Sequence, residues 1–234
     1  MDLRADSGII IPAYEAAAFL GATLEAVLRH AEPDRVAVVD DGSRDATAAV
    51  AERAGVACLR HPENRGKGSA LMTGLEWARG RGFTWAVTLD ADGQHTAEDL
   101  QRFWSAPVGE DTAVVVGRRG MRGSRMPWHR RFSNWLTTRM VSRLAGKPVF
   151  DAQCGFRMYR LSAARASGLP ASGHFEWESQ ALILCGRRGF SIVPVDIATV
   201  YTDNGSHMRL ASDTLRFLKM YRRLAAAPEA AWTR

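Results

Sequence analysis

Short apolar runs alternate with amphipathic helical patterns through the first half of the chain. The pattern predicts buried strands at residues 8–12, 35–40, 56–59, 84–89 and 112–117. It predicts helices between them at residues 16–31, 43–55, 68–82 and 96–104. Such an alternation favours an α/β fold built on one Rossmann-like, doubly wound and mostly parallel sheet with helices on both faces. Ligands bind such sheets outside the carboxyl ends of the strands.

The regular alternation stops after residue 118. The second half is predicted to contain a basic amphipathic helix near 128–145, a strand at 154–160, a helix near 175–187, a strand at 191–201 and a last helix over about 213–226. No internal repeat, low-complexity segment or linker separates the two halves. We therefore expect a single domain over residues 1–234 with an elaborated C-terminal half.

Polar side chains gather where the predicted strands stop. Four loops at these strand ends carry Tyr14, Asp40, Asp41, Arg65, Lys67, Asp90, Asp92, Gln94 and His95. Because the carboxyl ends of parallel strands share one edge of a sheet, we expect these side chains to form a site.

The segment LDADGQH ends a buried strand on two carboxylates, Asp90 and Asp92. Both point to the same side of an extended chain, and like charges repel there unless a cation lies between them. Mg²⁺ or Mn²⁺ would suit two carboxylates with Gln94 or His95 nearby, and it would leave coordination positions for substrate phosphates. The alternative is a pair of solvated turn aspartates, which the apolar strand directly before the pair disfavours.

The segments DDGS and NRGKGSA offer nucleotide contacts at two further strand ends. Asp40 and Asp41 are either turn and capping residues or acceptors of hydrogen bonds from a base or ribose. In NRGKGSA the glycines let the backbone approach a ligand, while Arg65 and Lys67 supply positive charge. Neither a Walker loop nor a GxGxxG fingerprint occurs in the sequence.

The placement of charge narrows the class of partner. The net charge is +6, and no acidic residue lies between Asp111 and Asp151, so we expect an anionic partner. A nucleic acid is disfavoured, because the acids at the strand ends would repel a phosphate backbone and no nucleic-acid motif is present.

The cysteines and the apolar runs argue against a thiolate metal site and against a membrane-spanning or secreted protein. Cys58, Cys154 and Cys185 are far apart in the sequence, which predicts reduced thiols and no thiolate metal site. No apolar run approaches the length of a membrane span, and the sequence does not open on a signal peptide. We therefore expect a cytoplasmic protein.

Six motifs, in order and spacing, carry a family resemblance. They are IIIPAYE, VVDDGSRDAT, ENRGKGSAL, LDADGQH, VVVGRR and DAQCGFRMYR. The chain resembles the family 2 glycosyltransferases over residues 8–220, most closely dolichyl-phosphate mannose synthase and the bacterial polyprenyl-phosphate glycosyltransferases. The resemblance implies a GT-A fold in which residues 8–117 bind the nucleotide-sugar and residues 118–226 bind the acceptor. It also implies a nucleotide-diphospho-sugar donor, a Mg²⁺ or Mn²⁺ cofactor on its pyrophosphate, and inversion at the anomeric carbon.

The resemblance also implies roles for individual residues. The implied nucleotide-sugar-binding set is Pro12, Tyr14, Glu15, Asp40, Asp41, Lys67, Asp90, Ala91, His207 and Arg209. The implied cation-binding set is Asp90, Asp92 and Gln94, and the implied catalytic set is Asp92, Asp151, Arg119 and Arg157. Pro12 and Tyr14 would border the base, and Arg119 would face the donor phosphates. Asp151 and Arg157 would lie by the acceptor.

The nature of the acceptor decides whether a base is needed. A phosphate acceptor is already anionic and needs little help from a base, whereas a hydroxyl acceptor would need a carboxylate, for which Asp151 is the candidate. The expected acceptor is a polyprenyl phosphate. The alternatives are another lipid, a soluble or cell-envelope glycan hydroxyl, or no acceptor at all in a non-catalytic nucleotide-sugar-binding protein.

Two segments depart from the family pattern. Relatives read PAYNE where this chain has Glu15 and Ala16, so either Glu15 reaches the nucleotide in place of the usual asparagine or that contact is lost. In YTDNGSHMRL, His207 and Tyr201 replace basic residues of the relatives. Phosphate contacts from this segment would then come from His207 and Arg209.

The basic helix at 128–145 has two interpretations. Its apolar positions recur at helical spacing among arginines: Trp128, Phe132, Trp135, Leu136, Met140 and Leu144. Such a stripe either faces the core or lies on an anionic membrane surface, and in the family a comparable helix lies at the membrane. The second interpretation places the protein at the inner face of the cell membrane.

Two further groups are given structural interpretations. Glu176 and Glu178 are predicted to be acidic residues at a helix amino terminus, where the helix dipole favours them. The isolated histidines, among them His61, are predicted to be surface or capping residues.

Overall fold

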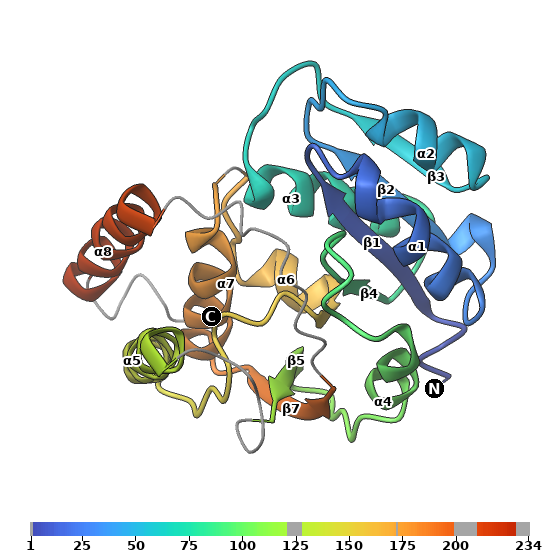
Figure 1. The fold of residues 1–234 in the computed structure, drawn as a ribbon. Coiled ribbons are helices and arrows are strands. Elements are labelled where there is room, and N and C mark those ends of the chain that lie inside the picture. Colours follow the sequence, from blue (N-terminus) through green and yellow to red (C-terminus); the bar gives the residue numbers. More distant parts are fainter. Residues whose placement is uncertain (1, 121–127, 172, 199–209, 228–234) are drawn as a thin grey trace.

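A seven-stranded sheet forms the centre of the molecule (Figure 1). The computed structural model describes residues 2–120, 128–171, 173–198 and 210–227. The strands are β1 (Ser7–Ala13), β2 (Val36–Asp40), β3 (Ala57–Arg60), β4 (Trp85–Thr88), β5 (Thr112–Arg119), β6 (Arg157–Arg160) and β7 (Ser191–Ile197). Their order across the sheet is β3-β2-β1-β4-β6-β5-β7.

The sheet is parallel except at one strand. β6 runs antiparallel to both of its neighbours, β4 and β5, whereas the other adjacent strands pair in parallel. The reversal places the start of β6 beside the end of β4, with Arg157 opposite Thr88. A segment of the C-terminal half therefore reaches the edge at which the acids of LDADGQH lie.

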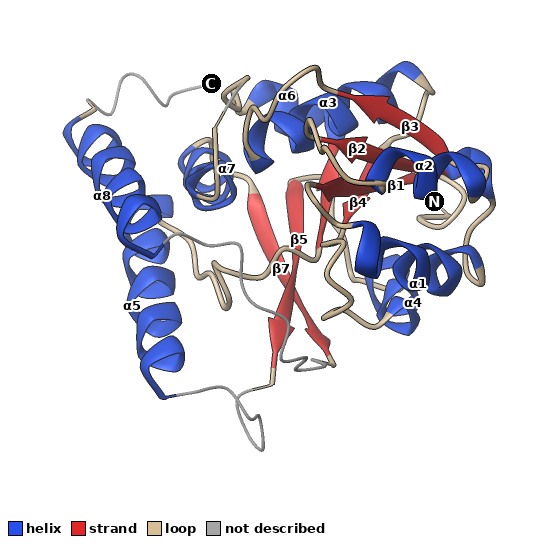
Figure 2. Ribbon diagram, turned by 45° about the horizontal axis from the view of Figure 1, so that its top comes forward, coloured by secondary structure: helices blue, strands red, loops and turns tan. Residues whose placement is uncertain are grey.

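Helices cover both faces of the sheet (Figure 2). They are α1 (Ala17–Leu28), α2 (Thr47–Arg53), α3 (Lys67–Gly80), α4 (Leu100–Trp104), α5 (Trp128–Ala145), α6 (Leu161–Ala166), α7 (Glu176–Arg187) and α8 (Leu210–Ala226), with short 3₁₀ turns at Pro33–Arg35 and Ala97–Asp99. α1, α2 and α4 lie on one face, and α3, α6 and α7 lie on the other, while α5 and α8 pack outside α7. The predicted doubly wound, mostly parallel sheet is confirmed.

Apolar side chains on both faces of the central strands form the core. Ile9, Ile10 and Ile11 of β1 are at most 1% exposed, as expected for a strand covered on both sides. α3 approaches this strand closely at Gly74, where a Cβ atom would come 2.3 Å from Cγ2 of Ile10. Glycine at this position lets the middle of α3 pack directly on β1.

The structure differs from the predicted secondary structure in one helix and in the length of one strand. Helix α6 is not predicted from the sequence, because its six residues are too few to show the apolar periodicity of a helix. The strand predicted at 191–201 is observed only to Ile197, and its last residues lie outside the described part of the chain.

The three cysteines are expected to be reduced, buried thiols, and of these Cys154 and Cys185 are buried, whereas Cys58 is half-buried. Cys58, Cys154 and Cys185 are free thiols. Burial raises the pKa of Cys154 to about 12 and that of Cys185 to about 11, so both remain protonated and unreactive at neutral pH.

Candidate active site

The polar loops meet at the carboxyl edge of β1, β2 and β4, as the sequence pattern predicts. The end of β1 pairs with the end of β2, with Ala13 opposite Asp40. The loop before α3 joins them, because the His61 amide donates to the Asp40 carbonyl oxygen at 2.9 Å. Four loops that are distant in sequence therefore lie together at this edge.

The loop after β2 caps the first turn of α1. Three successive amides, those of residues 15–17, donate to side chains of that loop. The acceptors are Ser43 Oγ at 3.0 Å, Thr47 Oγ1 at 2.9 Å and Asp45 Oδ2 at 3.0 Å. Amides at a helix start need such partners. Ser43 and Asp45 thus cap α1 across the site, and the amides of residues 15–17 are already occupied by acceptors of the protein.

Glu15 takes an unusual backbone conformation at this junction. Among the described residues it is the only non-glycine with a positive φ, at 50°, a region that asparagine adopts more readily than glutamate. Its Oε1 accepts a hydrogen bond from the Arg44 amide at 2.9 Å. The structure therefore directs this carboxylate toward the loop after β2, while the neighbouring Tyr14 is 41% exposed. Pro12 is buried within β1.

Asp40 is fully buried beneath the loop that follows it. Its Oδ1 accepts from the Ser43 amide at 2.9 Å, and its Oδ2 lies 3.3 Å from Arg60 Nε. Of the two interpretations that the sequence leaves open, these contacts match a residue that shapes the turn.

Asp41 joins β2 to the loop before α3. Its Oδ1 accepts from the Arg65 amide at 2.9 Å, and its Oδ2 accepts from the Gly66 amide at 2.8 Å. His61 Nδ1 lies 2.7 Å from Oδ1, and His61 Nε2 lies 2.9 Å from Thr73 Oγ1. Asp41 therefore fixes the NRGKG loop in place.

The expectation that His61 is a surface or capping residue is wrong. It is 5% exposed and lies between the loop before α3 and the body of that helix. One signal could have placed it, because His61 lies two residues after the predicted strand at 56–59 and hence falls at the same edge as Asp41.

Lys67 lies between two carboxylates at the start of α3. Its Nζ is 2.6 Å from Asp90 Oδ1 and 2.9 Å from Glu178 Oε2. Burial would lower the pKa of Lys67, but the charges of Asp90 and Glu178 outweigh it and hold that pKa above its ordinary value. Burial would likewise raise the pKa of Asp90, yet the Lys67 ammonium holds it well below the usual range. This is a charged triad at the edge of the sheet.

Glu178 is a site residue that the sequence does not reveal. A helix amino terminus accounts for Glu176 and Glu178 alike, and Glu178 does lie in the first turn of α7. The side chain of Glu178 is nevertheless 9% exposed and paired with Lys67. No motif spacing links residue 178 to residue 90, so only the packing of α7 on α3 brings them together.

Asp92 is the second acid of the pair. Burial raises its pKa, and the nearby charge of Asp90 raises it further. Its Oδ1 accepts a hydrogen bond from the Gln94 amide at 3.0 Å. His95 Nε2 lies 3.7 Å from Asp90 Oδ2, while Ala91, between the acids, is buried and accepts at its carbonyl from Thr23 Oγ1 at 3.3 Å.

The donor set at this edge fits a divalent cation only in part. Asp92 is a half-buried carboxylate beside a like charge, which is an arrangement that a cation relieves. Within the described ranges, no group of three or more His, Cys, Asp or Glu side chains is placed to hold a metal ion. Further ligands would therefore have to come from water or from a bound phosphate.

Arg119 and Asp151 form a bidentate ion pair in the C-terminal half. Arg119 Nε and Nη2 donate to the two oxygens of Asp151 at 2.7 and 2.9 Å, and Asn134 Nδ2 donates at 3.1 Å. The same loop continues to Gly155, where a Cβ atom would come 2.4 Å from Asp90 Oδ2. Only glycine lets this loop lie against the acid pair, and so Arg119 and Asp151 are tied to the same site.

Arg157 does not face an acceptor in this structure. Its side chain is 0% exposed, and its guanidinium donates to the carbonyls of Ala152 at 2.9 Å, Cys154 at 2.8 Å and Glu178 at 2.6 Å. These contacts are those of a residue that holds the loop carrying Asp151, and the catalytic role of Arg157 stays a prediction.

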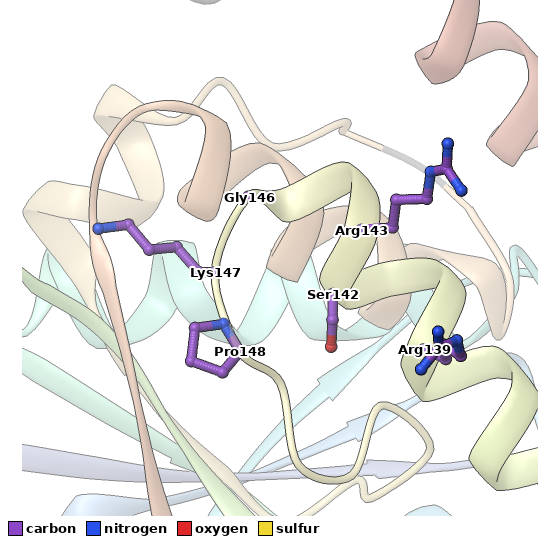
Figure 3. A pocket seen from close by; sticks show the side chains of 6 residues that line it. All are labelled: Arg139, Ser142, Arg143, Gly146, Lys147 and Pro148. Carbon is purple, nitrogen blue, oxygen red and sulfur yellow. The ribbon is translucent and has the colours of Figure 1, made fainter.

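The outer face of α5 exposes large apolar side chains. Trp128 is 80% exposed, and Phe132, Trp135 and Leu136 are also exposed. Farther along the helix, an open pocket of about 520 Å³ is lined by Arg139, Ser142, Arg143, Gly146, Lys147 and Pro148 (Figure 3). The core-facing interpretation is therefore wrong for the first half of the stripe, while Met140 and Leu144 are half-buried.

Two further sequence predictions concern membrane helices and the phosphate ligands near the C-terminal end. No helix in the described part of the chain is long and apolar enough to cross a membrane. His207 and Arg209, the predicted phosphate ligands, lie outside the described residues.

A doubly wound sheet with an Asp-x-Asp pair at its carboxyl edge is typical of glycosyltransferases of the GT-A fold. The family model described as Glycosyl transferase family 2 matches residues 8–168. The chain belongs to this family, and it is a glycosyltransferase. The resemblance stated from the six motifs is thus confirmed.

Relatives and solved structures agree with this assignment. The chain is 33% identical to the undecaprenyl-phosphate mannosyltransferase of Micrococcus luteus, covering 84% of each chain. It is 31% identical to the polyprenol monophosphomannose synthase of Mycolicibacterium smegmatis, covering 81% of this chain and 75% of that one. Glucosyl-3-phosphoglycerate synthase of Mycobacterium tuberculosis, crystallised with Mn²⁺, UDP-glucose and phosphoglyceric acid, shares the fold with a TM-score of 0.72 and 17% identity. That match covers 97% of this chain and 83% of the other.

Proposed function

We propose that the protein transfers a sugar, with inversion, from a UDP- or GDP-sugar to a polyprenyl phosphate at a membrane surface, and that Mg²⁺ or Mn²⁺ is required. The observation that carries the proposal is the exposed aromatic face of α5, formed by Trp128, Phe132 and Trp135. It lies in the same half of the chain as the Arg119–Asp151 pair. Relatives named for undecaprenyl and polyprenol acceptors support the same acceptor class.

The edge of β1, β2 and β4 would hold the donor. Tyr14 is exposed beside the buried Pro12 and can border a base. Asp40 and Asp41 would act chiefly by fixing the loops against which the nucleotide lies, with Glu15 supporting the same loops. Fixed loops of this kind keep their dipoles oriented before the substrate arrives, which favours charge development in the transition state.

A divalent cation would be held by Asp92, with Asp90 and Gln94 beside it and with the donor phosphates supplying further oxygens. When bound, it would stabilise the negative charge of the departing nucleoside diphosphate. Solved structures of the same fold were crystallised with Mn²⁺ or Mg²⁺ and UDP, which supports this part of the proposal.

The Arg119–Asp151 pair would serve the acceptor side. A phosphate acceptor is attracted by the positive charge of this half, which has no acidic residue between Asp111 and Asp151. Such an acceptor carries its own negative charge, so no base has to remove a proton from it. Because both oxygens of Asp151 accept hydrogen bonds from Arg119, this carboxylate is poorly placed to act as a base for a hydroxyl. The pair therefore favours a phosphate over the glycan alternative.

An acceptor competition tests the proposal. Purified protein would be given UDP- and GDP-sugars with Mn²⁺ and three acceptors: undecaprenyl phosphate in vesicles, 3-phosphoglycerate, and a soluble glycan. Mass spectrometry should detect a glycosyl-phospholipid that disappears with EDTA. Transfer only to 3-phosphoglycerate or to the glycan would reject the lipid acceptor. Donor binding without transfer to any acceptor would favour the non-catalytic alternative.

A further inference from the structure

The Lys67 ammonium already lies where a cation is expected. It comes from the first residue of α3 and reaches Asp90 of the loop after β4 at 2.6 Å and Glu178 of α7 at 2.9 Å. Its side chain is 15% exposed, so solvent screens the triad weakly. The three groups carry a combined charge of −1 when all are ionised.

Both oxygens of Asp90 are engaged by the protein. Oδ1 contacts Lys67, and Oδ2 faces His95 Nε2 at 3.7 Å. Gly155 packs directly against the carboxylate, because a Cβ atom there would come 2.4 Å from Oδ2, and the side chain of Asp90 is 28% exposed. Of the two acids, Asp92 alone faces no cationic side chain at ion-pairing distance in the described part of the chain. One free carboxylate is a weak site for a divalent cation, whose affinity rises with the number of charged oxygen ligands.

We propose that Lys67 prevents the acid pair from holding a divalent cation on its own, so that the cation binds only together with the donor diphosphate. This inference deepens the proposed function and rests on it. The diphosphate supplies the oxygens and the negative charge that the Lys67 ammonium takes away from Asp90. Lys67 is therefore a positioning residue that couples binding of the cation to binding of the nucleotide.

Glu178 sets how strongly Lys67 neutralises Asp90. Oε2 of Glu178 shares the ammonium, while its buried Oε1 has no hydrogen-bond partner in the described part of the chain and lies 4.0 Å from Arg157 Nε. Loss of the Glu178 charge would leave the whole Lys67 charge on Asp90. The two residues should therefore change the affinity of the site for a cation in opposite directions.

Mn²⁺ titrations followed by electron paramagnetic resonance, without nucleotide, test the coupling. Relative to the wild type, Lys67→Met should bind Mn²⁺ more tightly, on the order of tenfold for one charge removed at this range. Glu178→Gln should bind it more weakly by a similar factor. Lys67→Met/Glu178→Gln restores the net charge and should return to within about threefold of the wild type. If Lys67 and Glu178 serve only to stabilise the fold, all three variants should bind Mn²⁺ more weakly than the wild type. That result would overturn the inference.

Matched controls separate site effects from global charge. Lys219→Met on α8 and Glu25→Gln on α1 make the same charge changes at exposed positions, and both should leave Mn²⁺ binding unchanged. Circular dichroism checks that each variant is folded, and the double variant keeps the test valid if the buried Glu178 charge unfolds Lys67→Met.

Repeating the titration with UDP and with GDP distinguishes this inference from the proposed function. In the wild type, one nucleotide should tighten Mn²⁺ binding at least tenfold, and in Lys67→Met the gain should be smaller. If neither nucleotide tightens Mn²⁺ binding in the wild type, the metal-dependent function itself fails. If a nucleotide does so but Lys67→Met does not bind Mn²⁺ more tightly without it, only the role of Lys67 is rejected.

Discussion

The carboxyl edge of the sheet and the outer face of α5 differ in how far their side chains are satisfied within the protein. Charged groups at the edge have protein partners, whereas apolar groups on α5 are exposed to solvent. At the edge, Asp40, Asp41 and Asp90 are each held by amides or cations of the protein itself. On α5, Trp128 and Trp135 project into solvent among arginines. In the first region these three acids have partners within the protein before any ligand binds, as a preorganised polar site requires. The second leaves an apolar surface uncovered, which is typical of a surface that meets a partner.

The strongest way to break the first region is to remove Arg157. In Arg157→Leu, the carbonyls of Ala152, Cys154 and Glu178 would lose a buried donor and the Glu178 carboxylate would lose a nearby positive charge, so the free energy of unfolding should fall by about 3–5 kcal/mol. Urea denaturation followed by tryptophan fluorescence measures this change.

Arg165→Leu serves as the control, because it makes the same substitution on the exposed side of α6. Its cost should stay within about 0.5 kcal/mol. A comparable loss in both variants would mean that Arg157 does not hold the Asp151 loop.

Removing the charge of Asp92 should affect catalysis rather than folding. Asp92→Asn keeps the shape of the side chain but takes away the carboxylate that would hold the cation, so kcat should fall on the order of 100-fold. Steady-state kinetics over a Mn²⁺ series would measure it, with Asp34→Asn, exposed in the turn before β2, as the control. Full turnover in Asp92→Asn would reject the assignment of Asp92 to the cation.

The difference between the two regions also explains which parts could be predicted from the sequence. The strands of the first half are buried runs ended by turn residues, and their loops share an edge for topological reasons. That pattern locates Asp41, Asp90 and Asp92 together without a structure. The packing of α7 on α3 leaves no trace in local spacing, and therefore Glu178 could be assigned only to the dipole of its own helix.

Sequence patterns also predict the role of a residue poorly where the same residue type can bind a ligand or support the fold. Arg157 lies in a basic half of the chain, and its charge alone suggests an anionic substrate, yet burial turns the same guanidinium into a partner for backbone carbonyls. The stripe on α5 has the period of a core-facing helix, but the period cannot say whether the covering partner belongs to the same chain. For Arg157 and for the stripe on α5, the sequence allows two interpretations, and the burial of the side chains decides between them.

The α5 surface can be tested separately from the edge. Trp135→Ala/Arg139→Ala removes an exposed aromatic side chain and the guanidinium that lies 6.0 Å from its ring centroid. Affinity for vesicles rich in anionic lipid should drop roughly tenfold or more, because interfacial tryptophan and arginine both contribute to such binding. Vesicle flotation measures the drop, and Arg53→Ala, exposed on α2, is the control for lost charge. Unchanged flotation of the double variant would remove the membrane from the proposal.

The smallest expected effect lies at Glu15, where the edge departs from the family pattern. Glu15→Asn should relieve a positive φ that costs a non-glycine residue about 1 kcal/mol, but it should lose the hydrogen bond from the Arg44 amide, which is worth a similar amount. The free energy of unfolding should therefore change by less than about 0.5 kcal/mol. Glu63→Asn, in an exposed loop without a positive φ, controls for the substitution. A clear stabilisation by Glu15→Asn alone would show that the hydrogen bond to Arg44 contributes little, and Glu15 would then be free to turn toward the donor.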